Sequence, residues 1–334
     1  MEYKNRIVYD WLTFTSKIHS PNDLIDLMGF KDVTFESLPG MNGYRDRLYY
    51  DGVSICYNGR DDMGVCVNIS GHGCRAFERD GNGDYDSIFR EIIDNWDEES
   101  EKRQMNITRL DVAYDDFTDL LDLNAIVSDV FSGNIVSRFE KSKITVDFEG
   151  SERGGLTVYH GSRSSNISIR IYDKKQESHV DDVDHWVRCE LQLRGSNALG
   201  FICVDDTVDN KYFGVLNNYI RYVVPDDHDS NKRRWATAPH WQRFLDSHTD
   251  TISIFCKPAD TYDLYKLDNY VFGQCAAAVY TMIDVCGIDN FLSRVHKKVS
   301  TSKLNPHYRQ IKNTHNQHAN NILAYLQRNN LLDL

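Results

Sequence analysis

Apolar and polar residues alternate along three stretches of the chain, residues 107–116, 167–174 and 186–194. This period of two is typical of a β-strand with one face on the core, because successive side chains point to opposite faces. The expected polar faces are Arg109, Asp111, Ala113 and Asp115 in the first stretch, Arg170, Tyr172 and Lys174 in the second, and Arg188, Glu190, Gln192 and Arg194 in the third. If the three strands are neighbours in one sheet, a tyrosine, several cations and three carboxylates share one polar surface.

The wider pattern divides the first 224 residues into two similar successions of elements. Before residue 100 we expect elements at residues 8–15, 21–28, 33–38, 44–50, 53–57, 65–70 and 86–96, of which the second and last are helices. After it we expect strands at 107–116, 144–148, 156–160, 167–172 and 186–193, and helices at 119–131, 197–203 and 212–223. This repetition predicts an α+β fold, a curved and mostly antiparallel sheet of two βαβββ-like halves with helices packed on one side.

The pattern changes after residue 224. Residues 225–240 are polar and turn-rich, which predicts a linker or exposed loop. Residues 241–334 are expected to be mainly helical, with an extended segment over 252–255, a long amphipathic helix over 262–286 and a last helix over 322–332. DNA recognition and oligomerisation are both open roles for this region.

Two segments contain residue types found in calcium-binding or phosphate-binding loops, but not at the spacing that such loops require. Residues 80–91 are rich in aspartate, but Tyr85 stands where a calcium loop needs glycine, so a solvated loop that caps the following helix is expected. The glycines around His72 precede neither a helix start nor a Gly-Lys-Ser/Thr sequence, and we expect a turn there.

The composition indicates a globular protein without a membrane segment. With 334 residues and 41% hydrophobic content, the chain can bury a substantial core, and no run of about 18 apolar residues occurs. The eight cysteines include no CxxC pair, and the first residues lack a basic and then apolar leader. We therefore expect a cytoplasmic protein with neither a disulfide framework nor a zinc site.

The net charge of −12 argues against binding to nucleic acid, because such affinity comes largely from neutralising phosphates. The charge is uneven, however. Residues 80–101 hold nine acidic residues and one arginine, whereas residues 288–334 hold seven Lys and Arg and two Asp. An acidic region and a basic tail are compatible with a DNA-binding surface elsewhere on the protein.

Carboxylates, a tyrosine and cations on one sheet face are the groups that metal-assisted phosphodiester chemistry uses. Oxygen ligands suit Mg²⁺ or Mn²⁺, cations hold phosphate oxygens, and a tyrosine can attack covalently. The same carboxylates could instead be ion-pair partners of the neighbouring arginines. Tyr172 is one of 19 tyrosines. Tyr159 is the next candidate nucleophile, followed by Tyr114, which is expected on the core side of its strand.

Six segments in sequence resemble the Rep_trans family, which includes plasmid rolling-circle initiators and MobT-type relaxases of integrative conjugative elements. They are DWLTF at 10–14, ISGHGCRAFE at 69–78, TRLDVAYDD at 108–116, GGLTVYHGSRSSN at 154–166, RIYDKKQE at 170–177 and RCELQLR at 188–194. Together they span roughly the first 200 residues. The resemblance therefore assigns the activity of that family to a nicking domain at residues 1–224, with halves at about 1–100 and 101–224.

The resemblance implies an enzyme that nicks one DNA strand at an origin on a mobile element. Tyr172 would attack the phosphodiester and leave a 5′-phosphotyrosyl enzyme and a free 3′-OH. By the same resemblance Asp111, Asp115 and Glu190 would bind Mg²⁺ or Mn²⁺, while Arg170, Lys174 and Arg188 would hold the scissile phosphate. The expected partners are origin DNA, single-stranded or hairpin at the nick, and a helicase or coupling protein, with no membrane. A homodimer is one open oligomeric state.

Two other functions stay open at this point. One is an initiator-like protein that binds an origin without cutting it, and the other is a metal-dependent phosphodiesterase that does not act on DNA. A nicked circle with a protein–DNA adduct would distinguish the enzyme from both. The chain has no His-hydrophobic-His metal motif, so metal binding would depend on carboxylates.

Overall fold

The computed structural model describes residues 3–96, 104–150, 152–162, 165–178, 183–246, 271–272 and 275–301. The chain forms two compact units, Met1–Lys257 and Pro258–Leu334. The first unit contains all the strands that the structure describes, and with them every residue of the expected polar face.

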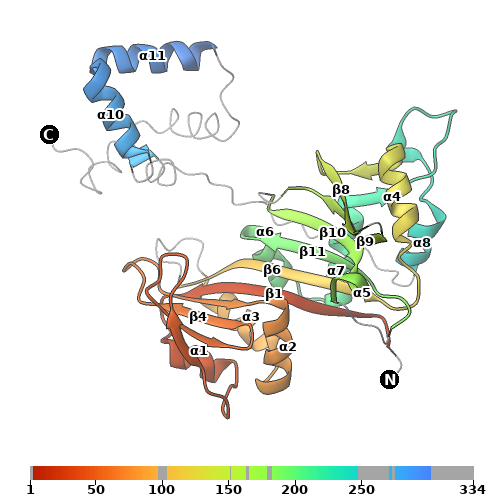
Figure 1. Ribbon diagram of the computed structural model, residues 1–334, viewed down its shortest axis with the longest axis horizontal. Helices are drawn as coiled ribbons and strands as arrows, with labels where there is room; N and C mark the ends of the chain where they lie inside the picture. The colour runs from red at the N-terminus through yellow and green to blue at the C-terminus, as the bar shows by residue number, and fades with distance from the viewer. Residues whose placement is uncertain are drawn as a thin grey trace. The chain divides into compact units, whose positions relative to one another are not determined.

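An antiparallel sheet of ten strands runs through the described part of the first unit (Figure 1). Its order is β2-β3-β4-β5-β1-β6-β11-β10-β9-β8. The strands are β1 (Arg6–Ser16), β2 (Glu36–Pro39), β3 (Asp46–Tyr50), β4 (Val53–Tyr57), β5 (Val65–Ile69), β6 (Met105–Asp116), β8 (Ser142–Glu149), β9 (Glu152–His160), β10 (Ile167–Asp173) and β11 (Val187–Arg194). A separate antiparallel pair joins β7 (Ile135–Ser137) and β12 (Ile220–Tyr222).

The strand order confirms the expected halves. The first strands of the two halves, β1 and β6, pair with each other at the centre of the sheet (Figure 1). Outward from β1 the order is β5, β4, β3 and β2, and outward from β6 it is β11, β10, β9 and β8. In each half, therefore, the last strand returns to pair with the first. The α+β fold with a mostly antiparallel sheet is as predicted.

The longer helices of this unit pack on the sheet and bury its apolar face. They are α1 (Pro21–Leu27), α2 (Gly71–Asp80), α3 (Tyr85–Asp94), α4 (Leu123–Ser132), α6 (Ser196–Cys203), α7 (Val208–Tyr219) and α8 (Pro239–Asp246). α2 contacts β1 and β4, and α6 contacts β6 and β11. The side chains between them form one continuous core, which includes Phe14, Leu110, Leu191 and Phe213. The opposite face of β6, β11 and β10 is left to polar side chains.

Residues 71–73 begin a helix, which corrects the expectation of a turn. The Ser70 hydroxyl caps α2 by accepting a hydrogen bond from the Gly73 amide. Gly73 serves close packing, because a Cβ there would lie 2.4 Å from the carbonyl oxygen of Gly52. Two glycines in the first turn lower the helix propensity there, which is why the sequence showed no sign of a helix start. The aspartate-rich loop that follows caps α3 through Asp84, as expected.

The first unit continues past residue 224, the end expected for the nicking domain. Residues 225–235 are mostly exposed. The next helix, α8, buries Trp241 and Phe244 fully in the main core. In the second unit the described helices are α10 (Ala276–Cys286) and α11 (Ile288–Thr301). The segments expected at 252–255 and 322–332 and the start of the helix expected over 262–286 lie outside the described residues.

Within the described residues, no helix is long and apolar enough to cross a membrane.

Substituting Gly73→Ala should lower the free energy of unfolding by about 1–3 kcal/mol, the usual cost of overpacking, because backbone must move to admit the new Cβ. Urea denaturation followed by circular dichroism would measure the loss. Gly155→Ala is the matched control, since its Cβ would meet an oxygen of Asp147 at 3.5 Å, an ordinary contact. Similar small losses in both variants would contradict the packing role of Gly73.

Candidate active site

Cross-strand pairing places the polar side chains of β11 and its two neighbours in transverse rows. Residues directly opposite each other in an antiparallel pair point to the same face. One row joins Tyr172, Arg188 and Asp115, and the next joins Arg170 to Glu190. The strands are therefore neighbours, as the sequence pattern required, and the tyrosine, arginines and carboxylates meet on one face.

Tyr172 lies in this row with 2% of its surface exposed. Its hydroxyl donates to Oε2 of Glu190 at 3.4 Å, and Cζ of Arg170 lies 3.9 Å from the centroid of its ring. Burial raises the pKa of the Tyr172 phenol and the charge of Glu190 raises it further, while Arg170 and Arg188 oppose the rise. The phenol is thus held beside an acceptor but stays protonated at neutral pH.

Glu190 and Asp111 are buried carboxylates that repel each other. Burial raises the pKa of Glu190 to about 7, against the charge of Arg170 and with the help of Asp111 and Asp10. Burial also raises the pKa of Asp111, although Arg109 Nε, 3.0 Å from Oδ1, acts to lower it. Arg170 Nη2 donates to Glu190 Oε2 at 3.0 Å. The arginines therefore offset only part of the cost of these buried charges.

Asp115 is saturated by donors. Arg188 binds both of its oxygens, Nε to Oδ1 at 2.6 Å and Nη2 to Oδ2 at 2.9 Å, and Trp186 Nε1 donates to Oδ1 at 2.8 Å. Although burial acts to raise the pKa of Asp115, the hydrogen bonds and charge of Arg188 lower it below the ordinary value. Asp115 is completely buried. Its geometry is that of a residue that fixes Arg188.

Asp10 also belongs to the site, although no role was predicted for it. Its Oδ1 accepts a hydrogen bond from Arg188 Nη1 at 2.6 Å. Burial is the main reason why the pKa of Asp111 and of Glu190 is raised, and the charge of Asp10 raises both further. The pairing of β1 with β6 shifts register between Tyr9 and Trp11, so Asp10 lies in an irregularity of the strand. Strict alternation with the buried Leu12 would have placed Asp10 on the core face. A carboxylate at a position expected to be in the core was the available signal.

The short helix α5 (Lys174–Ser178) brings Glu177 to the cations of this face. Glu177 Oε2 pairs with Lys174 Nζ, and its Oε1 lies 3.4 Å from Arg170 Nη2. Lys174 Nζ is also 5.7 Å from the centroid of the Tyr172 ring. Two of the cations expected to hold a phosphate are thus paired with an acidic side chain in this structure.

The two alternative tyrosines lie in different surroundings. Tyr114 is buried on the core face, against Tyr212, Phe213 and Phe244, and cannot meet a phosphate. Tyr159 lies on the polar face of β9, directly opposite Arg170. It is half-buried, and within the described residues its hydroxyl has no hydrogen-bond partner.

The oxygen donors of this face fit a hard divalent cation in kind. The negative charge of Asp10 raises the pKa of Asp111 and Glu190, and that of Asp111 also raises the pKa of Glu190. A bound Mg²⁺ or Mn²⁺ would offset this repulsion between carboxylates. The described residues nevertheless contain no group of three or more His, Cys, Asp and Glu side chains arranged as a metal site. Asp111 and Glu190 face arginines here, so binding an ion would require them to exchange partners.

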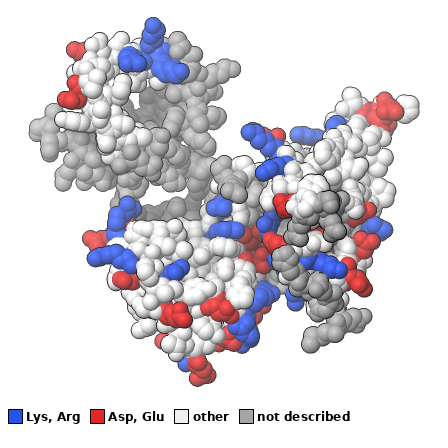
Figure 2. Space-filling view, in the orientation of Figure 1, with Lys and Arg blue, Asp and Glu red and all other residues white. Residues whose placement is uncertain are grey.

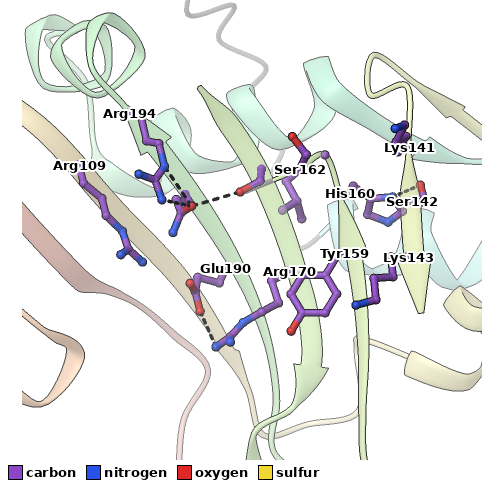
Figure 3. A pocket seen from close by; sticks show the side chains of 14 residues that line it. Arg109, Lys141, Ser142, Lys143, Tyr159, His160, Ser162, Arg170, Glu190 and Arg194 are labelled. Atoms are coloured by element: carbon purple, nitrogen blue, oxygen red, sulfur yellow. Dashed lines mark hydrogen bonds and ion pairs between the residues drawn. The ribbon is translucent and has the colours of Figure 1, made fainter. Parts of the chain in front are cut away.

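A cleft of about 680 Å³ extends along the polar face beside Glu190 and Arg170 (Figure 3). Its walls include Arg109, Lys141, Lys143 and Arg194 as well as Tyr159. On the face of the first unit shown in Figure 2, positive and negative side chains are interspersed. The net charge of −12 is therefore not a uniform acidic surface, and basic side chains gather in this cleft.

Two protein families match the parts of the chain that form this polar face. Residues 105–299 match the family model described as replication initiation factor, and residues 6–90 match the model described as rolling circle replication initiation protein N-terminal domain. The chain belongs to the Rep_trans family of replication initiation factors. The first match includes β6, β10 and β11, and the second includes the strand that carries Asp10.

Two relatives of this Rep_trans protein show how far the likeness extends. It is 25% identical over 292 residues to the "Putative DNA relaxase NicK" of Bacillus subtilis (strain 168), which covers 82% of this chain and 80% of that protein. The solved structure of the rolling circle replication initiator protein from Geobacillus stearothermophilus is 30% identical, with a TM-score of 0.66. That match covers 73% of this chain and 96% of the other.

The Glu190→Gln variant of this Rep_trans protein should be more stable than wild type at pH 8 and equally stable at pH 4. The pKa of Glu190 rises from 4.5 to about 7 on folding. The folded state therefore binds the proton more tightly, and wild type loses stability as pH rises from about 4.5 to 7. Glutamine keeps an acceptor for Arg170 and cannot ionise. Urea denaturation without divalent ions should show a gap on the order of 3 kcal/mol at pH 8.

The exposed Glu36 of β2 provides the control, since Glu36→Gln should change stability little at either pH. A gap for Glu190→Gln that is constant from pH 4 to pH 8, or of opposite sign, would contradict the raised pKa.

Proposed function

We propose that this protein nicks and rejoins one strand of DNA at an origin, with Tyr172 as the nucleophile. The observation that carries the proposal is the position of the Tyr172 hydroxyl, 3.4 Å from Glu190 and in one row with Arg188. The names of the two relatives, a DNA relaxase and a rolling circle replication initiator, support the same activity. Both replication and strand transfer begin with such a nick.

The proposed reaction is a transesterification. The phenol oxygen of Tyr172 forms a bond to phosphorus while the bond from phosphorus to the 3′ oxygen breaks. The phenol proton passes to Oε2 of Glu190, and the leaving 3′ oxygen takes up a proton from solvent, so the products are a 5′-phosphotyrosyl enzyme and a 3′-OH. Attack by a 3′-OH on the phosphotyrosine reverses these steps and rejoins the strand. Oε2 of Glu190 is the acceptor to which the phenol already donates, 3.4 Å away.

The cations divide into two roles. Arg188 is fixed between Asp115 and Asp10, so we assign it to stabilising the phenolate by its charge. Arg170 and Lys174 are assigned to the phosphate, which would displace Glu177 from both. Arg170 also has a buried Nε that finds no acceptor among the described residues, and a nonbridging phosphate oxygen would supply one.

We assign the divalent ion to Asp111 and Glu190, with Asp10 as third oxygen donor. Asp115, expected from the resemblance to be a ligand, is assigned to Arg188 instead, because both of its oxygens already accept hydrogen bonds from Arg188 and Oδ1 accepts another from Trp186. When bound, the ion would offset negative charge on the nonbridging oxygens and favour the phenolate.

Incubated with Mg²⁺ and supercoiled DNA that carries the origin of its own element, wild-type protein should produce nicked circles and a covalent adduct. Tyr172→Phe should lose both, because the ring remains and the nucleophilic oxygen is gone. Agarose gels and denaturing protein gels with labelled DNA measure the two products. Tyr49→Phe is the matched control, a strand tyrosine with an arginine 5.5 Å from its ring in the other half of the sheet.

Three outcomes decide between the candidates. Binding of the origin without nicking would favour a non-cutting initiator, and turnover without an adduct would favour a phosphodiesterase. An adduct that survives in Tyr172→Phe would move the nucleophile to another tyrosine, with Tyr159 first.

The Asp111→Asn and Asp115→Asn variants should respond differently to metal. Millimolar Mn²⁺ should raise the melting temperature of wild type and of Asp115→Asn, because a ligand that binds the folded state stabilises it. Asp111→Asn should show little or no rise. Without metal, Asp115→Asn should be the less stable of the two, by about 3–5 kcal/mol relative to wild type, because it leaves Arg188 with an incomplete partner in the interior.

Differential scanning fluorimetry measures these shifts, and Asp26→Asn, at an exposed position of α1, is the control. Loss of the Mn²⁺ response in Asp115→Asn but not in Asp111→Asn would return the ligand role to Asp115.

A further inference from the structure

The cleft beside Tyr172 has a regular arrangement of side chains across the sheet. Lys143 of β8 lies opposite Tyr159 of β9, Tyr159 lies opposite Arg170 of β10, and Arg170 lies opposite Glu190 of β11. These four residues form one transverse line on the polar face. Since neighbouring strands are about 5 Å apart, Lys143 lies roughly 10 Å along this line from Arg170. The tyrosine ring lies between the two cations (Figure 3).

The cations at the two ends of this line differ in their ion-pair partners. Arg170 is paired with Glu190 and Glu177. Lys143 and the neighbouring Lys141 are exposed, and within the described residues neither ammonium group has an ion pair or a hydrogen bond. Both line the cleft. They are therefore available for an anion from outside the chain.

Tyr159 combines an accessible ring with an unused hydroxyl. The residue is half-buried on the polar face and lines the cleft, although the aromatic residues of the core lie on the other face of the sheet. A flat aromatic ring between phosphate-binding cations is the arrangement on which an unpaired base stacks while its phosphates are held on either side. A duplex would not present a base face to such a ring.

We infer that this cleft binds the single-stranded segment next to the scissile phosphate. Tyr159 stacks on the base of the adjoining nucleotide, and Lys143 and Lys141 hold the next phosphate. The inference relies on the proposed function only for the place of the scissile phosphate, at Arg170 and Tyr172. It assigns Tyr159 a binding role that depends on its ring. A second nucleophile would depend on the hydroxyl instead.

The test compares two labelled probes, a thymidine 20-mer and an abasic 20-mer of the same phosphate backbone. All proteins also carry Tyr172→Phe, so that no covalent step contributes. Fluorescence anisotropy should show that Tyr159→Ala weakens binding of the thymidine 20-mer roughly 5- to 150-fold, the factor that corresponds to ~1–3 kcal/mol of stacking. Binding of the abasic 20-mer should change little. Tyr159→Phe, which keeps the ring, should preserve the difference between the probes.

Lysine variants test the phosphate contacts separately. Lys143→Ala and Lys141→Ala should each weaken both probes alike. The variant that carries both substitutions should reduce the slope of log affinity against log salt by about 0.7, the value for one phosphate of a single strand. Lys31→Ala, at an exposed position of the loop between α1 and β2, is the control. Circular dichroism and melting temperature establish that each variant is folded.

The inference is overturned if Tyr159→Ala weakens both probes equally or neither, or if Tyr159→Phe loses as much as Tyr159→Ala. It is also overturned if the lysine variants leave the salt slope unchanged. Because the probes require no nicking, a protein that binds as described but never forms an adduct would refute the proposed catalysis and leave the cleft assignment standing.

Discussion

The antiparallel register of β11 between β6 and β10 fixes which polar groups meet. A shift of one residue would turn every side chain of β11 to the opposite face. The core face of the strand prevents this, because Cys189 and Leu191 are fully buried and Val187 and Leu193 nearly so. Hydrophobic burial on one face thus holds Arg188 and Glu190 beside Tyr172 on the other, and the chemistry of the site depends on packing that never touches the substrate.

The polar face is crowded with charges that only partly compensate one another. Asp115 and Arg188 form a complete pair, whereas the burial of Glu190 and Asp111 raises their pKa despite neighbouring arginines. Removing charges from water is costly unless each is well paired. The divalent ion and the phosphate that we propose for this site would offset these charges. The same buried carboxylates therefore lower the stability of the protein without ligand and would raise its affinity for one.

Much of the fold could be predicted because its strands have one apolar face. Alternation alone identified the polar faces of β6, β10 and β11, and the repeated order of elements gave the two halves of the sheet. Local departures from regularity were not visible in the same way. Asp10 reaches the site through a register shift in β1, and the first turn of α2 contains Gly73, which the close approach of Gly52 requires. Which acid faces which arginine, as at Asp115, depends on three-dimensional distances that residue types do not determine.

The most direct test of the central claim is to identify the amino acid that becomes joined to DNA. Trypsin would cut after Arg170 and Lys174, so the adduct formed on origin DNA should yield a four-residue peptide, residues 171–174, bearing a nucleotide on Tyr172. Mass spectrometry with fragmentation assigns the modified residue. A nucleotide on this peptide is the predicted result. A nucleotide on Tyr159, or on any peptide that lacks Tyr172, would contradict the role assigned to the β10 tyrosine.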